Sequence, residues 1–183
     1  NGIELLVKKS SGKFNGWIGY TFSETKYYTE PSGWHNPNFD RTHTINIVGN
    51  YDLTSDLELS AALTQSSGNP YTKILGRVYD WEQSLYNDSY WYPIDSYLVG
   101  AKNTERYDDY FRIDIGMTRK GGNLFGLEYD TYWQIMNLTR HINILSYRYR
   151  TKTDPFTGTQ LGVQRQPIPM FPLIFTFGVK FEF

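Results

Sequence analysis

The sequence lacks cysteine, any long apolar run and any appreciable net charge. Without cysteine, the 183-residue chain can form neither a disulfide nor a thiolate metal site. No run of about 18 apolar residues is present, which excludes a transmembrane helix. The formal net charge of -1 offers no basic surface, so nucleic acid is not an expected partner. No secretory leader opens the sequence, and we therefore expect a processed exported protein or a piece of a longer chain.

Aromatic residues, in contrast, are abundant. Phe, Trp and Tyr make up 17% of the chain, although its mean hydropathy is negative at -0.54. This combination is typical of a membrane β-barrel, in which lipid-facing and lumen-facing residues alternate along each strand. It also fits a soluble β-sandwich, so composition alone leaves both classes open.

The last stretch of the chain, residues 173–183, has the clearest pattern. It reads LIFTFGVKFEF, and every odd position in it is apolar. A period of two indicates a β-strand with one apolar and one mixed face. At the edge of a soluble sheet, a strand this rich in aromatic residues would promote aggregation. In an outer-membrane barrel the same residues could face lipid, and a tilted membrane-spanning strand has a similar length, about 9–11 residues.

The same alternation recurs along the rest of the chain. It predicts strands over residues 2–9, 13–24, 40–53, 57–67, 110–120 and 124–150, the last with a phase slip between Asn137 and His141 that suggests a bulge or a break. Short turns are expected at 10–13, 53–56 and 120–123. Long loops are expected at about 26–39, 68–109 and 151–172, and residues 68–109 show no sustained period of either kind.

Short and long connections therefore alternate, as the periplasmic turns and extracellular loops of outer-membrane barrels do. If the long connections lie outside the cell, the chain has seven strands, and the first runs from the outside toward the periplasm. A complete bacterial barrel has an even number of strands, so seven indicate a fragment. We predict an all-β, antiparallel transmembrane β-barrel fragment spanning 1–183. A rival count splits the tract at 137–140 and gives a closed eight-stranded barrel, but it inverts the usual sidedness.

Four motifs carry a family resemblance: GKFNGWIGYTFS at 12–23, FDRTH at 39–43, SSGNPYT at 66–72 and YFRIDIG at 110–116. In this order, before a terminal Phe, they resemble the C-terminal part of TonB-dependent outer-membrane receptors that carry a carboxypeptidase-regulatory-like domain before the plug. The resemblance implies a 22-stranded barrel, of which these are the last seven strands. It also implies uptake of a scarce nutrient across the cell outer membrane, with no enzymatic activity and no cofactor.

The same resemblance implies a set of partners. These are the remainder of the barrel and its plug, the TonB–ExbB–ExbD complex acting through the N-terminal part, the barrel-assembly machinery, lipid and lipopolysaccharide, and a surface lipoprotein. Two other hypotheses stay open. The chain could be a client or cleaved fragment captured by the assembly machinery, or a small eight-stranded adhesin or structural barrel.

The final strand is the first candidate site. A C-terminal strand that ends in Phe resembles the signal read by the barrel-assembly machinery, and its carriers here are Phe177, Val179, Phe181 and Phe183. Such a strand would pair edge to edge with the machinery and present its aromatic face. These residues could also serve only as lipid contacts, and the two roles are compatible.

The long 68–109 segment is the second candidate site, because aromatic and acidic residues gather in it. The substrate-contact candidates are Tyr79, Trp81, Tyr90, Trp91 and Tyr92, whose rings could stack on sugars or chelates or grip a peptide. The simpler interpretation is that they pack the loop on itself and form an interfacial girdle.

No catalytic or metal-binding set emerges from the sequence. His35, His43 and His141 lack the spacing of a zinc site. Asp40, Arg41 and His43 lie where a loop re-enters the barrel, and we expect an ion pair at the rim there rather than chemistry.

Overall fold

The protein is built from β-strands. The computed structural model describes residues 1–84 and 87–182, and this part of the chain contains strands and turns but no helix. In the described residues, accordingly, no helix is long and apolar enough to cross a membrane. Phe183 lies outside the described residues, and so do the side chains of Tyr79 and Tyr90.

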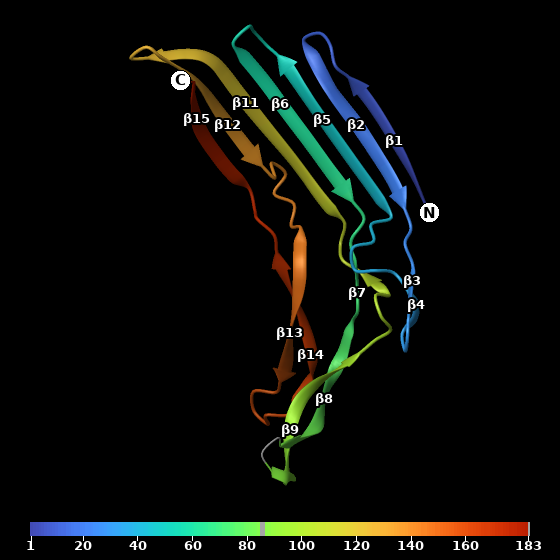
Figure 1. Cartoon of the computed structure of the whole chain (residues 1–183). Coiled ribbons are helices and arrows are strands. Elements are labelled where there is room, and N and C mark those ends of the chain that lie inside the picture. Colours follow the sequence, from blue (N-terminus) through green and yellow to red (C-terminus); the bar gives the residue numbers. More distant parts are fainter. Residues whose placement is uncertain (85–86, 183) are drawn as a thin grey trace.

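Seven strands form one antiparallel sheet in the order β1-β2-β5-β6-β11-β12-β15 (Figure 1). Its members are β1 (Gly2–Lys9), β2 (Phe14–Ser23), β5 (His43–Asp52), β6 (Leu57–Ser66), β11 (Tyr110–Leu124), β12 (Leu127–Met136) and β15 (Ile174–Glu182). The all-β, antiparallel class is thus confirmed, and the seven strands are those that the alternation predicts. β1 and β15 each pair on one side only, so the sheet is open and the described residues close no barrel.

The register gathers the apolar positions of all seven strands on one side of the sheet. One cross-strand row runs Val7, Ile18, Ile47, Leu63 and Ile113. We call this side the apolar face; it holds the even positions of β2 and the odd positions of the other six strands, up to Arg119 in β11. A slip of one residue in any pairing would turn that strand's apolar set to the opposite side.

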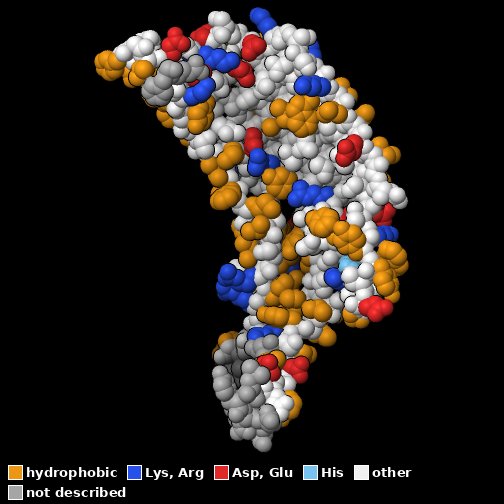
Figure 2. Space-filling view, in the orientation of Figure 1, with side chains coloured by type: hydrophobic (Ala, Val, Ile, Leu, Met, Phe, Trp, Pro, Cys, Tyr) orange, Lys and Arg blue, Asp and Glu red, His pale blue; other side chains and the backbone are white. Residues whose placement is uncertain are grey.

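The reverse side is polar. On it Asn50 donates a hydrogen bond to Asn15 (3.2 Å) and Arg112 pairs with Asp114 (2.7 Å). Figure 2 views this polar face, where white and charged atoms cover much of the strands, and hydrophobic side chains show along the margins and in one group within the upper part of the sheet. The two sides of one sheet therefore differ sharply in chemistry.

Short and long connections leave opposite ends of the sheet, as predicted (Figure 1). The turns at 10–13 and 53–56 are confirmed. The turn predicted at 120–123 is wrong, because β11 continues to Leu124 and the chain reverses over Phe125 and Gly126, both at positive φ (54° and 86°). Gly121, with φ 78°, instead accommodates an extra residue in β11, where the register shifts between Arg119 and Gly122.

The long connections were expected to be loops without strands, and this expectation is wrong. They contain β3 (Tyr27–Thr29) paired with β4 (Gly33–His35), β7 (Pro70–Tyr71) with β10 (Glu105–Arg106), β8 (Ile74–Ser84) with β9 (Asn87–Val99), and β14 (Gln160–Pro169). β14 pairs with β13 (Ile144–Thr153), most of which lies in the predicted 124–150 strand tract. Much of β8 and β14 is exposed and register shifts interrupt both hairpins, so hydrophobic alternation is weak.

The expected break in the 124–150 tract is confirmed. β12 ends at Met136, and β13 begins at Ile144 in a different sheet. The eight-strand count is therefore wrong for the main sheet, because β13 pairs with β14 and not with β12 or β15.

A hydrophobic core is nearly absent. Among the described residues Tyr71 is the one buried hydrophobic side chain, at 8% exposure, and it lies beyond the end of the main sheet. No second layer formed by residues 1–84 or 87–182 covers the apolar face, so side chains such as Ile18, Phe175 and Phe177 are at least half exposed. A contiguous apolar surface of this kind marks a contact with lipid or another protein rather than with water.

Candidate functional site

The terminal strand lies at one edge of the sheet, with its aromatic residues on the apolar face. Phe177 packs against Trp133 of β12, with ring centres 5.5 Å apart, and Phe181 packs against Tyr129 at 6.0 Å. Val179 lies between them on the same side. Three of the four residues predicted for the assembly signal therefore form one exposed apolar row beside a free strand edge, and the fourth, Phe183, is outside the described residues.

The substrate-contact candidates lie on the β8–β9 hairpin, at the end far from the short turns (Figure 1). Trp81 pairs with Pro93 and Gln83 with Trp91, which places the two tryptophans on one face as diagonal neighbours. They are 60% and 52% exposed. The structure thus brings Trp81 and Trp91 together as a pair available to a ligand.

Tyr92 lies on the opposite face of this hairpin. Its hydroxyl donates to Glu82 Oε2 (3.1 Å), its cross-strand partner. This hydrogen bond, with a smaller effect of burial, raises the pKa of Tyr92 above its usual value of 10.0. Tyr92 therefore belongs with Glu82 and not with the tryptophan pair.

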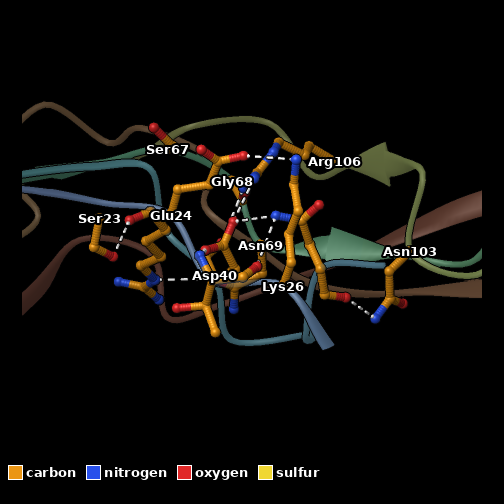
Figure 3. Close-up of polar contacts among 12 residues, drawn as sticks. Ser23, Glu24, Lys26, Asp40, Ser67, Gly68, Asn69, Asn103 and Arg106 are labelled. Carbon is orange, nitrogen blue, oxygen red and sulfur yellow. Dashed lines mark hydrogen bonds and ion pairs between the residues drawn. The ribbon is translucent and has the colours of Figure 1, made fainter. Parts of the chain in front are cut away.

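A buried ion pair ties the outer connections to the end of the sheet (Figure 3). The Asp40 side chain is 0% exposed and accepts hydrogen bonds from Thr25 N (2.9 Å), Asn36 Nδ2 (3.0 Å) and Arg106 Nη2 (2.6 Å). Arg106 Nη1 also donates to the backbone carbonyls of Asp40 and Gly68, each at 2.9 Å. Two connections, β2–β5 and β6–β11, meet at this one carboxylate and guanidinium, which we call the Asp40 junction.

Opposing influences set the pKa of Asp40. Burial is the largest of them and would raise the pKa, but the hydrogen bonds from Arg106, Thr25 and Asn36, with the charge of Arg106, together outweigh it. The pKa of Asp40 is therefore lowered from its ordinary value of 3.8, and the carboxylate stays ionised at neutral pH.

Arg41, next to Asp40, connects two of the motifs that carry the family resemblance. Its Nε donates to Asn69 Oδ1 (2.9 Å) and its Nη1 to Ser66 Oγ (3.1 Å). The backbone N–H of His43 donates to Ser67 Oγ (3.1 Å). Motifs that are distant in the sequence thus converge where the sheet meets the outer hairpins, and they build that junction rather than a catalytic centre.

A tyrosine cluster forms the base of the outer hairpins. Tyr107 stacks on Tyr71, with ring centres 4.6 Å apart, and on Tyr147 at 5.1 Å. The Arg165 guanidinium lies 4.1 Å from the Tyr147 ring centre and donates to the Tyr71 hydroxyl (2.5 Å). Burial raises the pKa of Tyr107 and of Tyr147 above 10.0, and the cluster joins β7, β13 and β14 through neutral rings and one cation.

Two buried asparagines complete the outer end of β11 where β12 has ended. Asn137, at φ 54°, donates its backbone N–H to Asp114 Oδ1 (2.9 Å). The side-chain amide of Asn143 accepts from Phe111 N (2.8 Å) and donates to Phe111 O (2.9 Å), as a neighbouring strand would. The edge of β11 therefore keeps its backbone hydrogen bonds without a strand beside it.

Histidines and carboxylates build no metal centre in the described ranges, where no group of three or more His, Cys, Asp or Glu is placed to hold an ion. His43 Nδ1 shares a hydrogen bond with the Tyr20 hydroxyl (2.9 Å), and His35 Nδ1 with Gly33 O (3.0 Å). Both contacts fit structural roles.

Comparisons with known proteins add no assignment, because no family model, curated protein or solved structure matches the chain. The resemblance to TonB-dependent receptors therefore stays a prediction from the sequence motifs. The functional argument rests on the geometry of the sheet and its connections.

The sequence predicted an ion pair at Asp40 but not that Arg106 is the residue that pairs with it. An ion pair was expected among Asp40, Arg41 and His43, whereas Asp40 pairs with Arg106, 66 residues further along the chain. No spacing rule connects two residues that far apart. The Tyr71–Tyr147 cluster was missed for the same reason, because Tyr71 and Tyr107 lie far from Tyr147 in the sequence and no spacing rule connects them.

Substitution of Asp40 tests the junction. Asp40→Asn leaves the Arg106 guanidinium partly buried without a counter-charge, and we expect the outer connections to lose about 3 kcal/mol of local stability. Limited proteolysis within 26–39 and 101–109 measures this loss. Glu24→Gln is the matched control, because the Glu24–Lys26 pair is exposed and its loss is expected to cost under about 1 kcal/mol. Equal protease resistance of both variants would contradict the role given to Asp40.

The junction also has a predicted pH dependence. A carboxyl group with a lowered folded-state pKa stabilises the fold fully above its unfolded pKa, near 3.8, and this stabilisation is lost as pH falls through the lower folded value. Wild-type resistance to an acid-active protease should therefore persist down to about pH 4 and decline below it. The Asp40→Asn variant should not show this added decline.

Proposed function

We propose that the chain forms part of the wall of an outer-membrane β-barrel, and that this barrel is a TonB-dependent receptor taking up a scarce nutrient. The observation that carries the proposal is the apolar face, which spans seven strands and which nothing in the described chain covers. Removing one such side chain from water stabilises a structure by about 1.5–3 kcal/mol, so a surface of this size needs an apolar partner.

Three further features support a membrane barrel over a soluble sheet. The apolar face alternates strictly with a polar face, as lipid-facing and lumen-facing residues do. Both edge strands have an unpaired side, to which neighbouring strands of a larger barrel would add. The turns at one end are short and the connections at the other are long and carry hairpins, which matches the periplasmic and outer sides of such barrels.

The nutrient-uptake part of the proposal rests on the sequence motifs together with the outer hairpins. In a receptor of this kind the outer connections would contact the substrate first, and the Trp81–Trp91 pair offers them an exposed aromatic surface. Two of the motifs, 39–43 and 66–72, meet at the Asp40 junction, which ties the β2–β5 connection to the β6–β11 connection. No catalytic step is proposed for the chain.

The free edge of β15 favours a second role for the same protein, as a client of the barrel-assembly machinery. A strand with one unpaired backbone side and an apolar row can add to an exposed strand of another protein. We propose that Phe177, Val179 and Phe181, with Phe183, are read in this way during assembly. Such recognition precedes the transport function and does not compete with it.

The two native tryptophans of the sheet provide a test of the membrane orientation. Trp133 lies on the apolar face and Trp17 on the polar face. In vesicles of phosphatidylcholine brominated on its acyl chains, Trp133→Phe should remove quenchable fluorescence, because bromine quenches only rings that touch the chains. Trp17→Phe should remove unquenched fluorescence instead. Equal quenching of both tryptophans would contradict the proposed orientation.

The tryptophan pair on the outer hairpin provides a test of uptake. The substrate is first identified by offering cells a panel of ferric siderophores, cobalamin, glycans and peptides. The double variant Trp81→Ala/Trp91→Ala should then raise the half-saturation concentration for uptake about tenfold or more, with unchanged amounts of folded barrel. Tyr92→Phe, on the opposite face of the hairpin, is the control and should leave uptake intact. Unchanged uptake in the double variant would remove the pair from the substrate path.

The assembly role is separable from simple lipid contact by comparing two strands. Phe181→Ser on β15 should slow assembly of the protein by reconstituted assembly machinery in vesicles. Ile135→Ser, on the neighbouring β12 and on the same apolar face, should slow it less, because it removes lipid contact but leaves the terminal strand intact. If both substitutions slow assembly equally, the terminal row acts only as a lipid-facing surface.

A further inference from the structure

A pocket of about 380 Å3 opens on the apolar face at the short-turn end of the sheet. Arg119, Gly122, Tyr129, Thr131 and Trp133 line it, together with Asp56 from the β5–β6 turn. The bulge in β11 creates the space, because the extra residue near Gly121 displaces the end of this strand from the regular register. We call this the Arg119 pocket.

Arg119 is a charged residue on a face whose other strand residues are mostly apolar. Its register partners are Leu57 and Thr131, so it projects among apolar and aromatic side chains. Its side chain is 70% exposed, and its one polar contact in the described chain is a distant one, 4.0 Å from Nε to Asp56 Oδ2. The Asp56 carboxylate is held by the Thr54 hydroxyl at 2.7 Å. The guanidinium therefore keeps donors free to bind an anion.

The charge on the apolar face is of one sign and lies at one end. Among its described positions in the seven strands the charged residues are Lys9 and Arg119, both next to the short turns. The carboxylate nearest to Arg119, that of Asp56, belongs to the β5–β6 turn. Lys120 also lines the pocket, but its Nζ pairs with Glu58 Oε2 on the polar face, at 3.2 Å. In a membrane, cations at the boundary of the hydrocarbon face the phosphates of the lipid head groups.

The pocket walls suit a head group as well. Tyr129 and Trp133 are residue types that settle at membrane interfaces, with an apolar ring and a polar tip. A Cβ on Gly122 would lie 2.3 Å from the Tyr129 ring, so glycine lets this ring lie flat against the strand. Phe181 and Phe177 of the neighbouring strand β15 contact these two rings on the same face of the sheet.

We propose that the Arg119 pocket binds the phosphate group of a membrane phospholipid in the leaflet nearest the short turns. This inference rests on the proposed membrane function. The planar guanidinium of Arg119 donates two parallel hydrogen bonds to phosphate oxygens, Tyr129 and Trp133 flank the head group, and the acyl chains continue along the apolar face. The ligand class is a phospholipid rather than a soluble phosphate, because the pocket opens on the side that faces hydrocarbon.

Native mass spectrometry of the full protein in detergent micelles, titrated with phosphatidylglycerol, tests the inference. Arg119→Gln should weaken binding of one lipid about tenfold or more, because it removes a charged hydrogen-bonding group. Arg119→Lys should restore part of the affinity. Arg148→Gln, an exposed arginine of β13 on the outer hairpins, is the control and should bind as the wild type does.

Three outcomes decide the matter. Equal affinity of wild type and Arg119→Gln would overturn the proposed site. Displacement of the lipid by millimolar inorganic phosphate would overturn the choice of a lipid over a soluble anion. Quenching of Trp133 by brominated lipid, measured in the same Arg119→Gln variant, separates the two proposals: if quenching persists while the lipid affinity is unchanged, only the pocket assignment fails.

Discussion

The structure depends on one constraint: the apolar face of the seven-stranded sheet must pack against something other than the described residues. The seven strands satisfy one another's backbone hydrogen bonds, but they leave rows of Ile, Leu and Phe side chains without a covering layer. The hydrophobic effect therefore cannot stabilise the sheet through an internal core. Backbone pairing and an apolar partner for this face together have to do so. If that partner is hydrocarbon, as proposed, the unpaired edges of β1 and β15 must also pair with further strands, because open sheet edges do not occur in hydrocarbon.

Polar groups perform a different task at the outer end of the sheet. The Asp40 junction, the Arg41 contacts and the Asn143 amide satisfy backbone and side-chain groups where regular pairing stops. The Tyr107 stack then fixes the base of the outer hairpins. These networks bring together the sequence motifs of the family resemblance. Residues of these motifs therefore have a physical role in connecting the seven-stranded sheet to the hairpins that project from it.

Hydrophobic alternation in the sequence predicts a strand correctly where one side of that strand is apolar and the other polar. Alternation predicted all seven strands of the sheet and their two faces, because a strand such as β15 must keep its Phe residues on one side. It failed for β8, β9 and β14, because strands with much exposed surface need no alternation. Gly121 and Gly122 suggested a turn where the structure has a bulge, since both features favour glycine. The Asp40–Arg106 pair could not be predicted, because it depends on how distant connections meet in space.

The most direct test of the lipid-facing assignment uses the absence of cysteine, which makes every introduced cysteine unique. Nitroxide labels are placed one at a time at positions 44–51 of β5 in the membrane-embedded protein, and their collisions with oxygen and with a water-soluble nickel chelate are measured. Oxygen, which concentrates in hydrocarbon, should give maxima at Ile45, Ile47, Gly49 and Tyr51, and the nickel chelate should give maxima at the positions between them. Accessibility without a period of two, or nickel maxima at the apolar positions, would contradict the account.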